Sequence, residues 1–95
     1  MGMSLATASA MPEISRFFGI VISMFYDEHG VPHFHAKYGE YRASVEVESG
    51  LLRGDLPPRV AGLVLEWRAK HVAELLENWA RARSGQPLTR VPPLE

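Results

Sequence analysis

Side chains alternate between polar and apolar on both sides of Gly39, and this alternation limits the possible folds more than any other feature of the sequence. Successive side chains of a strand point to opposite faces of a sheet. A strand from residue 33 to residue 38 therefore sorts its side chains by polarity, with His33, His35 and Lys37 on one face and Phe34, Ala36 and Tyr38 on the other. Gly39-Glu40 suits a two-residue hairpin loop, because glycine adopts the positive φ that such a loop requires.

The hairpin predicts which residues lie opposite one another across the two strands. The apolar face pairs Tyr38 with Tyr41, Ala36 with Ala43 and Phe34 with Val45, and the polar face pairs Lys37 with Arg42, His35 with Ser44 and His33 with Glu46. A shift of one residue would mix the two faces, so their separation supports this register. The like-charged pair of Lys37 and Arg42 is unfavourable, and it either points into water or binds an anion.

The remaining strands lie on either side of this hairpin. A second turn at Ser49-Gly50 predicts a short strand over Leu51–Gly54, with Glu46 placed between His33 and Arg53. Before the histidines, Phe17–Tyr26 is apolar, aromatic and β-branched, which is typical of a strand covered on both faces. The sequence thus predicts four strands, each antiparallel to the one before it.

A helix is predicted from Pro58 to Arg83, because proline is tolerated in a first helical turn and Gly85 is typical of a helix end. Two apolar stripes follow helical spacing: Val60, Leu63, Val64, Trp67, His71, Leu75 and Asn78 in one, and Leu65, Val72, Leu76 and Trp79 in the other. Two stripes exceed what one small sheet can cover. Either the helix bends near Lys70, or part of it packs against a partner.

The predicted fold class is α+β, a four-stranded antiparallel meander packed against one long C-terminal helix. Residues 1–10 are rich in small side chains and are expected to form a flexible extension, and residues 11–95 are expected to form a single domain. The helix should cover the sheet face that carries Phe34 and Val45. The face that carries the histidines is then left for water, the C-terminal tail or a partner.

Composition excludes several classes of function. The formal net charge is −1 with histidine neutral, which favours neither nucleic acid nor an anionic membrane as partner. The chain has no cysteine, so disulfides, thiolate zinc sites and thiol nucleophiles are impossible. It has no apolar run long enough to cross a bilayer and no signal-peptide pattern at its start, so we expect a cytoplasmic protein.

Six short motifs resemble a family of small bacterial proteins, the domain of unknown function 4160. They are MPEISRFFGI at 11–20, PHFHA at 32–36, YGEY at 38–41, LEW at 65–67, LLENW at 75–79 and GQPL at 85–88. The resemblance implies no established chemistry. It does imply a gene often paired with that of a second small domain of unknown function, a layout similar to toxin–antitoxin modules.

The polar face of the hairpin offers two kinds of chemistry. His33 and His35 can both reach one divalent metal ion, with Glu46 as a third ligand and Asp27 or His29 as a possible fourth. Alternatively, the two histidines serve as acid and base in metal-free RNA cleavage, with Lys37 and Arg42 holding the phosphate. His33, His35 and Lys37 are then the catalytic candidates, although the chain as a whole is not basic and nucleic-acid binders usually are.

A third interpretation is a binding module, either a homodimer or one half of a pair with a neighbouring gene's product. It depends on the second helical stripe, and the predicted interface residues are Leu65, Val72, Leu76 and Trp79. Trp67 and Trp79 point in different directions on a straight helix, so one of them is expected to face the partner. His71 lies in the other stripe and is interpreted as a hydrogen-bonded core histidine.

Overall fold

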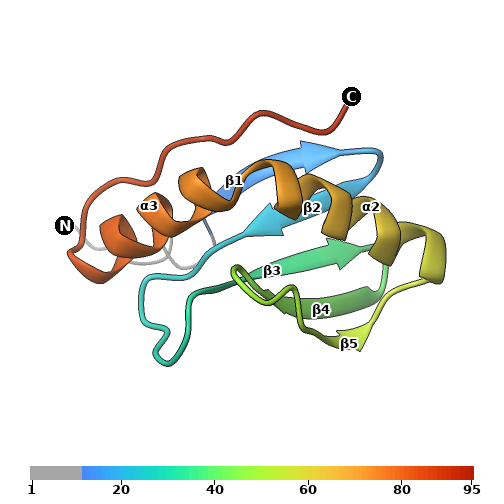
Figure 1. Ribbon diagram of the computed structural model, residues 1–95, viewed down its shortest axis with the longest axis horizontal. Helices are drawn as coiled ribbons and strands as arrows, with labels where there is room; N and C mark the ends of the chain where they lie inside the picture. Colours follow the sequence, from blue (N-terminus) through green and yellow to red (C-terminus); the bar gives the residue numbers. More distant parts are fainter. Residues whose placement is uncertain (1–11) are drawn as a thin grey trace, which may run out of the picture.

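The computed structural model describes residues 12–95, so the predicted extension over residues 1–10 lies outside the described residues. The described part of the chain contains five strands followed by two helices. The strands are β1 (Glu13–Phe17), β2 (Ile20–Ser23), β3 (His33–Tyr38), β4 (Tyr41–Glu46) and β5 (Leu52–Asp55), and the helices are α2 (Pro58–Lys70) and α3 (Val72–Arg83). The strands form one antiparallel sheet in chain order (Figure 1). This confirms the α+β class and the meander, with one more strand than predicted.

The additional strand, β1, lies before the stretch predicted as one strand over Phe17–Tyr26, and a turn at the start of that stretch joins β1 to β2. Phe18 and Gly19 both adopt positive φ, 51° and 80°, as the central residues of a tight hairpin turn do. The residues on either side of the turn pair with each other, Phe17 opposite Ile20. An uninterrupted apolar run concealed this turn, and Gly19 was its only sign in the sequence.

The register of β3 and β4 is the predicted one at all six pairs, from Tyr38 opposite Tyr41 to His33 opposite Glu46. The register of β4 and β5 is not, because Arg53 lies opposite Ser44 and not opposite Glu46. The connecting loop is longer than two residues: Val47 is fully buried, and its N–H donates to the Pro32 carbonyl at 3.0 Å. A shift of two residues preserves the facing of side chains, so Arg53 stays on the polar face.

The predicted long helix is two helices that meet at His71, which has a non-helical φ of −131°. The His71 N–H donates to the Arg68 carbonyl at the end of α2, and the His71 carbonyl accepts from the Leu75 N–H in the first turn of α3. This break corresponds to a bend near Lys70, one of the two alternatives that the apolar stripes left open. Each helix therefore buries its own set of side chains: Val60, Val64 and Trp67 in α2, and Leu75, Asn78, Trp79 and Ala82 in α3.

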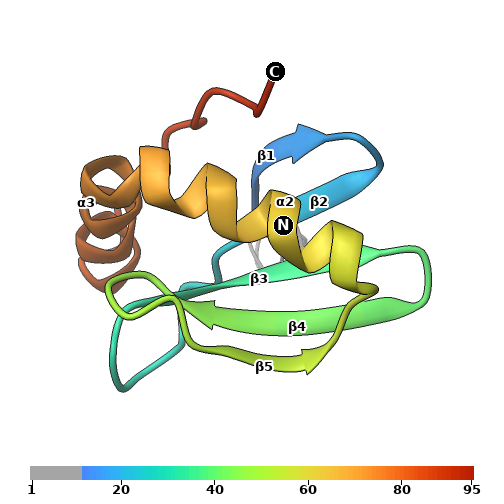
Figure 2. The same ribbon diagram turned by 45° about the vertical axis from the view of Figure 1, so that its right-hand side comes forward.

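The core lies between α2 and one face of the sheet, as predicted. It joins Phe34, Ala36, Val45 and Val47 of the sheet and its loop to Val60, Val64 and Trp67 of α2. Figure 2 shows α2 running across the sheet, with α3 turned away at one end of it. Within residues 12–95, no helix is both long enough and apolar enough to cross a membrane.

The C-terminal tail returns along the helices toward β1 (Figure 1). The Val91 N–H donates to the Ile14 carbonyl of β1 at 2.8 Å, and the Trp67 indole N–H donates to the Pro92 carbonyl at 2.8 Å. Val91 and Leu94 are buried in the core. The tail therefore covers the outer edge of β1, which would otherwise expose unpaired backbone groups.

Candidate functional site

Strand β3 places two histidines side by side on the sheet face that α2 does not cover. Phe34 and Ala36 point into the core, so alternation along the strand turns His33 and His35 the other way. The two imidazole rings lie with their centres 5.3 Å apart. Their common orientation makes them available to one ligand.

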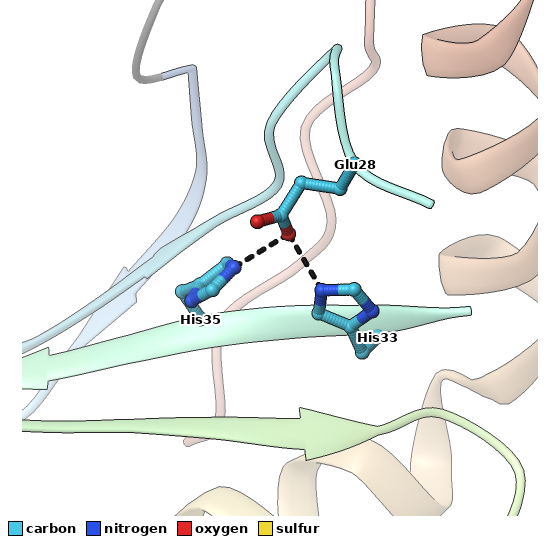
Figure 3. A group of neighbouring side chains, drawn as sticks. All are labelled: Glu28, His33 and His35. Atoms are coloured by element: carbon cyan, nitrogen blue, oxygen red, sulfur yellow. Dashed lines mark hydrogen bonds and ion pairs between the residues drawn. The ribbon is translucent and has the colours of Figure 1, made fainter. Parts of the chain in front are cut away.

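A carboxylate from the loop between β2 and β3 lies between the two rings. The Nε2 atoms of His33 and His35 are each 2.6 Å from the same oxygen of Glu28, Oε1 (Figure 3). The three ligand atoms lie within 4.8 Å of one another. Their side chains are partly buried, with exposed fractions of 19% for His33, 31% for His35 and 29% for Glu28. The cluster is therefore preorganised and still reachable from solvent.

Neighbouring groups fix the orientation of both rings. His33 Nδ1 lies 2.8 Å from the Val31 carbonyl, which can only accept a hydrogen bond, so Nδ1 carries a proton. The neutral ring then has its lone pair on Nε2, the atom that faces Glu28. The ring of His33 packs against Trp79 at 5.0 Å, and the ring of His35 packs against Phe25 at 4.5 Å, both between ring centres.

The charge of the cluster is set by opposing effects on Glu28. Burial by itself raises the pKa of the Glu28 carboxyl, but the hydrogen bond and charge of His35, followed by those of His33, outweigh burial and lower the pKa below its usual value of 4.5. Glu28 is therefore an anion at neutral pH.

The structure places Glu46 elsewhere. It lies opposite His33 as predicted, yet its carboxylate accepts a hydrogen bond from the Ser49 hydroxyl at 2.6 Å and it is not part of the cluster. Asp27 and His29 are exposed and also lie outside the cluster. Sequence reasoning missed Glu28 because the conformation of the loop, and not its composition, decides which of its side chains turns back to β3.

The two remaining candidate residues, His71 and Lys37, lie in different parts of the molecule. His71 is partly buried at the break between the helices, where it packs on Trp67 and pairs with Glu74. Lys37 lies on the same face of β3 as His35, is exposed, and lines a hollow of 590 Å³ that also touches His35. A second hollow of 210 Å³ lies beside His33, lined by Glu46 and Arg53 among others.

The predicted interface residues differ in burial. Trp79 is only 7% exposed and packs in the core, and Trp67 is fully buried, so the expectation that one tryptophan faces a partner is wrong. The break at His71 explains the error, because α3 has turned relative to α2. Leu65, Val72 and Leu76 are partly buried and pack against the core.

These observations define a small α+β domain with a cluster of two histidines and one carboxylate on the open face of its sheet. Residues 19–80 match the family described as the domain of unknown function DUF4160, and the chain belongs to this family. The match includes Glu28, His33 and His35, and it leaves out β1, the end of α3 and the C-terminal tail. Neither the curated proteins nor the solved structures that we compared with the chain gave a significant match.

Proposed function

We propose that this domain binds a divalent transition-metal ion through Glu28, His33 and His35. The proposal is carried by one observation: two histidine Nε2 atoms converge on one carboxylate oxygen, each at 2.6 Å. Imidazole nitrogen and carboxylate oxygen are common ligands of zinc and of other first-row metals. Because the three ligand atoms already lie within 4.8 Å of one another, small side-chain rotations bring them around one ion.

The surroundings of His33 fit a ligand. Metal-binding histidines usually donate their second ring N–H to a carbonyl or carboxylate, which orients the ring and fixes the tautomer. The Val31 carbonyl accepts that hydrogen bond here. Three protein ligands leave a further position for water or a small molecule, as catalytic zinc sites do and structural ones do not.

The metal-free RNA-cleaving alternative fits the geometry less well. Phosphoryl transfer to the 2′-hydroxyl needs an acid and a base on opposite sides of the phosphorus, in line with the attacking and leaving oxygens. His33 and His35 instead direct their Nε2 atoms to one point. That arrangement favours the shared binding of one atom over two separate proton transfers.

Calorimetric titration with zinc, nickel and manganese tests the proposal. We expect the wild type to bind at least one of these ions, and Glu28→Gln and His35→Ala to bind it at least about tenfold more weakly, since even indirect supports of metal ligands contribute that much. Glu46→Gln is the matched control and should bind like the wild type. Affinity should fall on acidification, because protons compete for the imidazole nitrogens. Equal binding by the wild type and Glu28→Gln would overturn the proposal.

A second proposal is association with a protein, either a second copy of this chain or the small protein of a toxin–antitoxin-like pair. It is supported by Leu65, Val72 and Leu76, which the core of the single chain buries only in part. Leu76→Lys should then weaken the complex and leave the fold intact. Ala73→Lys is the control, because Ala73 is an exposed position on the same helix.

Sedimentation together with circular dichroism tests this second proposal. We expect the wild type and Ala73→Lys to associate and Leu76→Lys to sediment as a folded monomer. If the wild type is a monomer both alone and with its neighbour's product, or if Leu76→Lys unfolds, the stripe belongs to the core and the proposal fails.

A further inference from the structure

Two cations face each other on the open face of the sheet, beside the candidate metal ligands. Lys37 of β3 lies directly opposite Arg42 of β4, and both side chains are exposed. Within residues 12–95, neither takes part in an ion pair, although Asp55 lies opposite Arg42 on β5. Like charges placed directly opposite are destabilising, so this pair disfavours the sheet unless an anion joins it.

The same two residues line the hollow of 590 Å³ on this face. The next row of side chains across the sheet is Ser23, His35 and Ser44, in which two small residues flank the histidine. Their small size leaves the space, and their hydroxyls can donate hydrogen bonds into it. The volume is in the range of sites that hold small molecules.

The chemistry of the lining differs from one side of the hollow to the other. Lys37 and Arg42 offer unpaired positive charge. At β1, Arg16 also lines the hollow, but its charge is balanced by Glu13 at 2.8 Å. His35 brings the candidate metal site to the hollow, and Phe25 beside it offers an aromatic ring. His35 and Lys37 are two residues apart, so their Cα atoms are roughly 7 Å apart along the strand.

We propose that the hollow binds the phosphate group of a small phosphate ester of nucleotide size, held by Lys37 and Arg42. Phosphate suits the pair because arginine binds two of its oxygens at once and lysine binds as a point charge. The proposal deepens the metal-site proposal and rests on it for one contact, a phosphate oxygen that reaches the metal at His35. A nucleic-acid polymer is disfavoured, because the chain has a net charge of −1, whereas domains that bind nucleic acid usually have a basic patch.

The probes are adenosine 5′-monophosphate and adenosine, titrated into the metal-free and the metal-loaded protein and followed by calorimetry. We expect the monophosphate to bind and adenosine to bind at least tenfold more weakly. The double variant Lys37→Met/Arg42→Met should lose at least tenfold in affinity for the monophosphate. Arg59→Met is the matched control, because it removes an exposed cation at the start of α2, away from the hollow, and should bind like the wild type.

The outcomes separate this proposal from the metal-site proposal. If the metal binds to the wild type and the monophosphate does not bind to either form, the phosphate site is wrong and the metal site stands. If no metal binds, yet the double variant loses the monophosphate binding that the wild type shows, the phosphate site stands and the metal site is wrong. Equal binding of adenosine, or an equal loss in Arg59→Met, overturns the phosphate site, since neither result requires a phosphate held by Lys37 and Arg42.

Discussion

The path of the C-terminal tail depends on Asn78, a polar side chain in the core. It is fully buried on α3, its Nδ2 donates to the Thr89 carbonyl at 2.8 Å, and its Oδ1 accepts from the Thr89 N–H at 2.9 Å. Both backbone groups of Thr89 are thus satisfied by one side chain. This explains why an amide occupies a position within an otherwise apolar stripe.

Asn78→Ala should lower the free energy of unfolding by about 2–3 kcal/mol, because it removes two hydrogen bonds that the fully buried Asn78 side chain makes to the backbone of Thr89. Urea unfolding followed by circular dichroism measures this change. Glu77→Ala, at an exposed neighbouring position of α3, is the control and should change stability by less than about 0.5 kcal/mol. A loss as small as that of the control would show that water satisfies Thr89 equally well.

At the site, the sequence predicted the residues of the strand and not the residue of the loop. Alternation and turn chemistry were enough to place His33 and His35 together and His33 opposite Glu46, because both depend only on the pleat and the hairpin. Glu28 was passed over between Asp27 and His29, which were both considered. Its place depends on the path of a nine-residue loop from Met24 to Pro32, for which no local rule gives the conformation.

Among the elements, turns decided which predictions were right. Gly39-Glu40 has a sequence typical of a hairpin loop, and the register that it predicted is confirmed. Ser49-Gly50 did not fix the loop length, because the burial of Val47 keeps that residue beside Pro32 and displaces β5 by two positions. The break at His71 was predicted only as one of two alternatives, since no proline or glycine marks it.

Strand β5 depends on a glycine in a way that α2 does not. Gly54 has a φ of +126°, and a Cβ atom there would lie 2.5 Å from the Arg42 carbonyl oxygen of β4. Gly54→Ala should therefore lower the free energy of unfolding by about 2 kcal/mol or more. Gly62 lies in α2, where a Cβ would meet nothing within 4 Å, and Gly62→Ala should raise stability by about 0.5–1 kcal/mol.

Thermal unfolding of the two glycine variants, each compared with the wild type, tests this contrast. The same chemical change is made in both, so opposite shifts of Tm would be due to backbone conformation and local space alone. If Gly54→Ala unfolds at the temperature of the wild type, β5 tolerates a different conformation and contributes little to the sheet.

At the scale of the whole molecule, the two ends of the described chain are held together by charge as well as by backbone hydrogen bonds. Glu13 of β1 accepts hydrogen bonds from Arg16 at 2.8 Å and from Arg90 of the tail at 3.1 Å. These two guanidinium groups, Arg16 first, lower the pKa of the Glu13 carboxyl from 4.5 to about 2. The tail is therefore attached to β1 by an interaction that requires an ionised Glu13.

This attachment predicts how stability depends on pH. The pKa of Glu13 is lower in the folded chain than in the unfolded chain, so its contribution to stability is complete above about pH 4.5, falls as the pH decreases, and is lost below about pH 2. Since the arginines are largely exposed and screened by solvent, the contribution at neutral pH should be about 0.5–1 kcal/mol.

Urea unfolding of the wild type and of Glu13→Gln, at pH 7 and at pH 2, measures this contribution. The wild type should be more stable than the variant at pH 7, and the two proteins should have the same stability at pH 2. Arg90→Gln should show a smaller difference of the same sign, because Arg16 still binds Glu13 in that variant. A deficit of Glu13→Gln that persists at pH 2 would mean that the substitution disturbs the packing of the tail, and that charge does not hold the tail to β1.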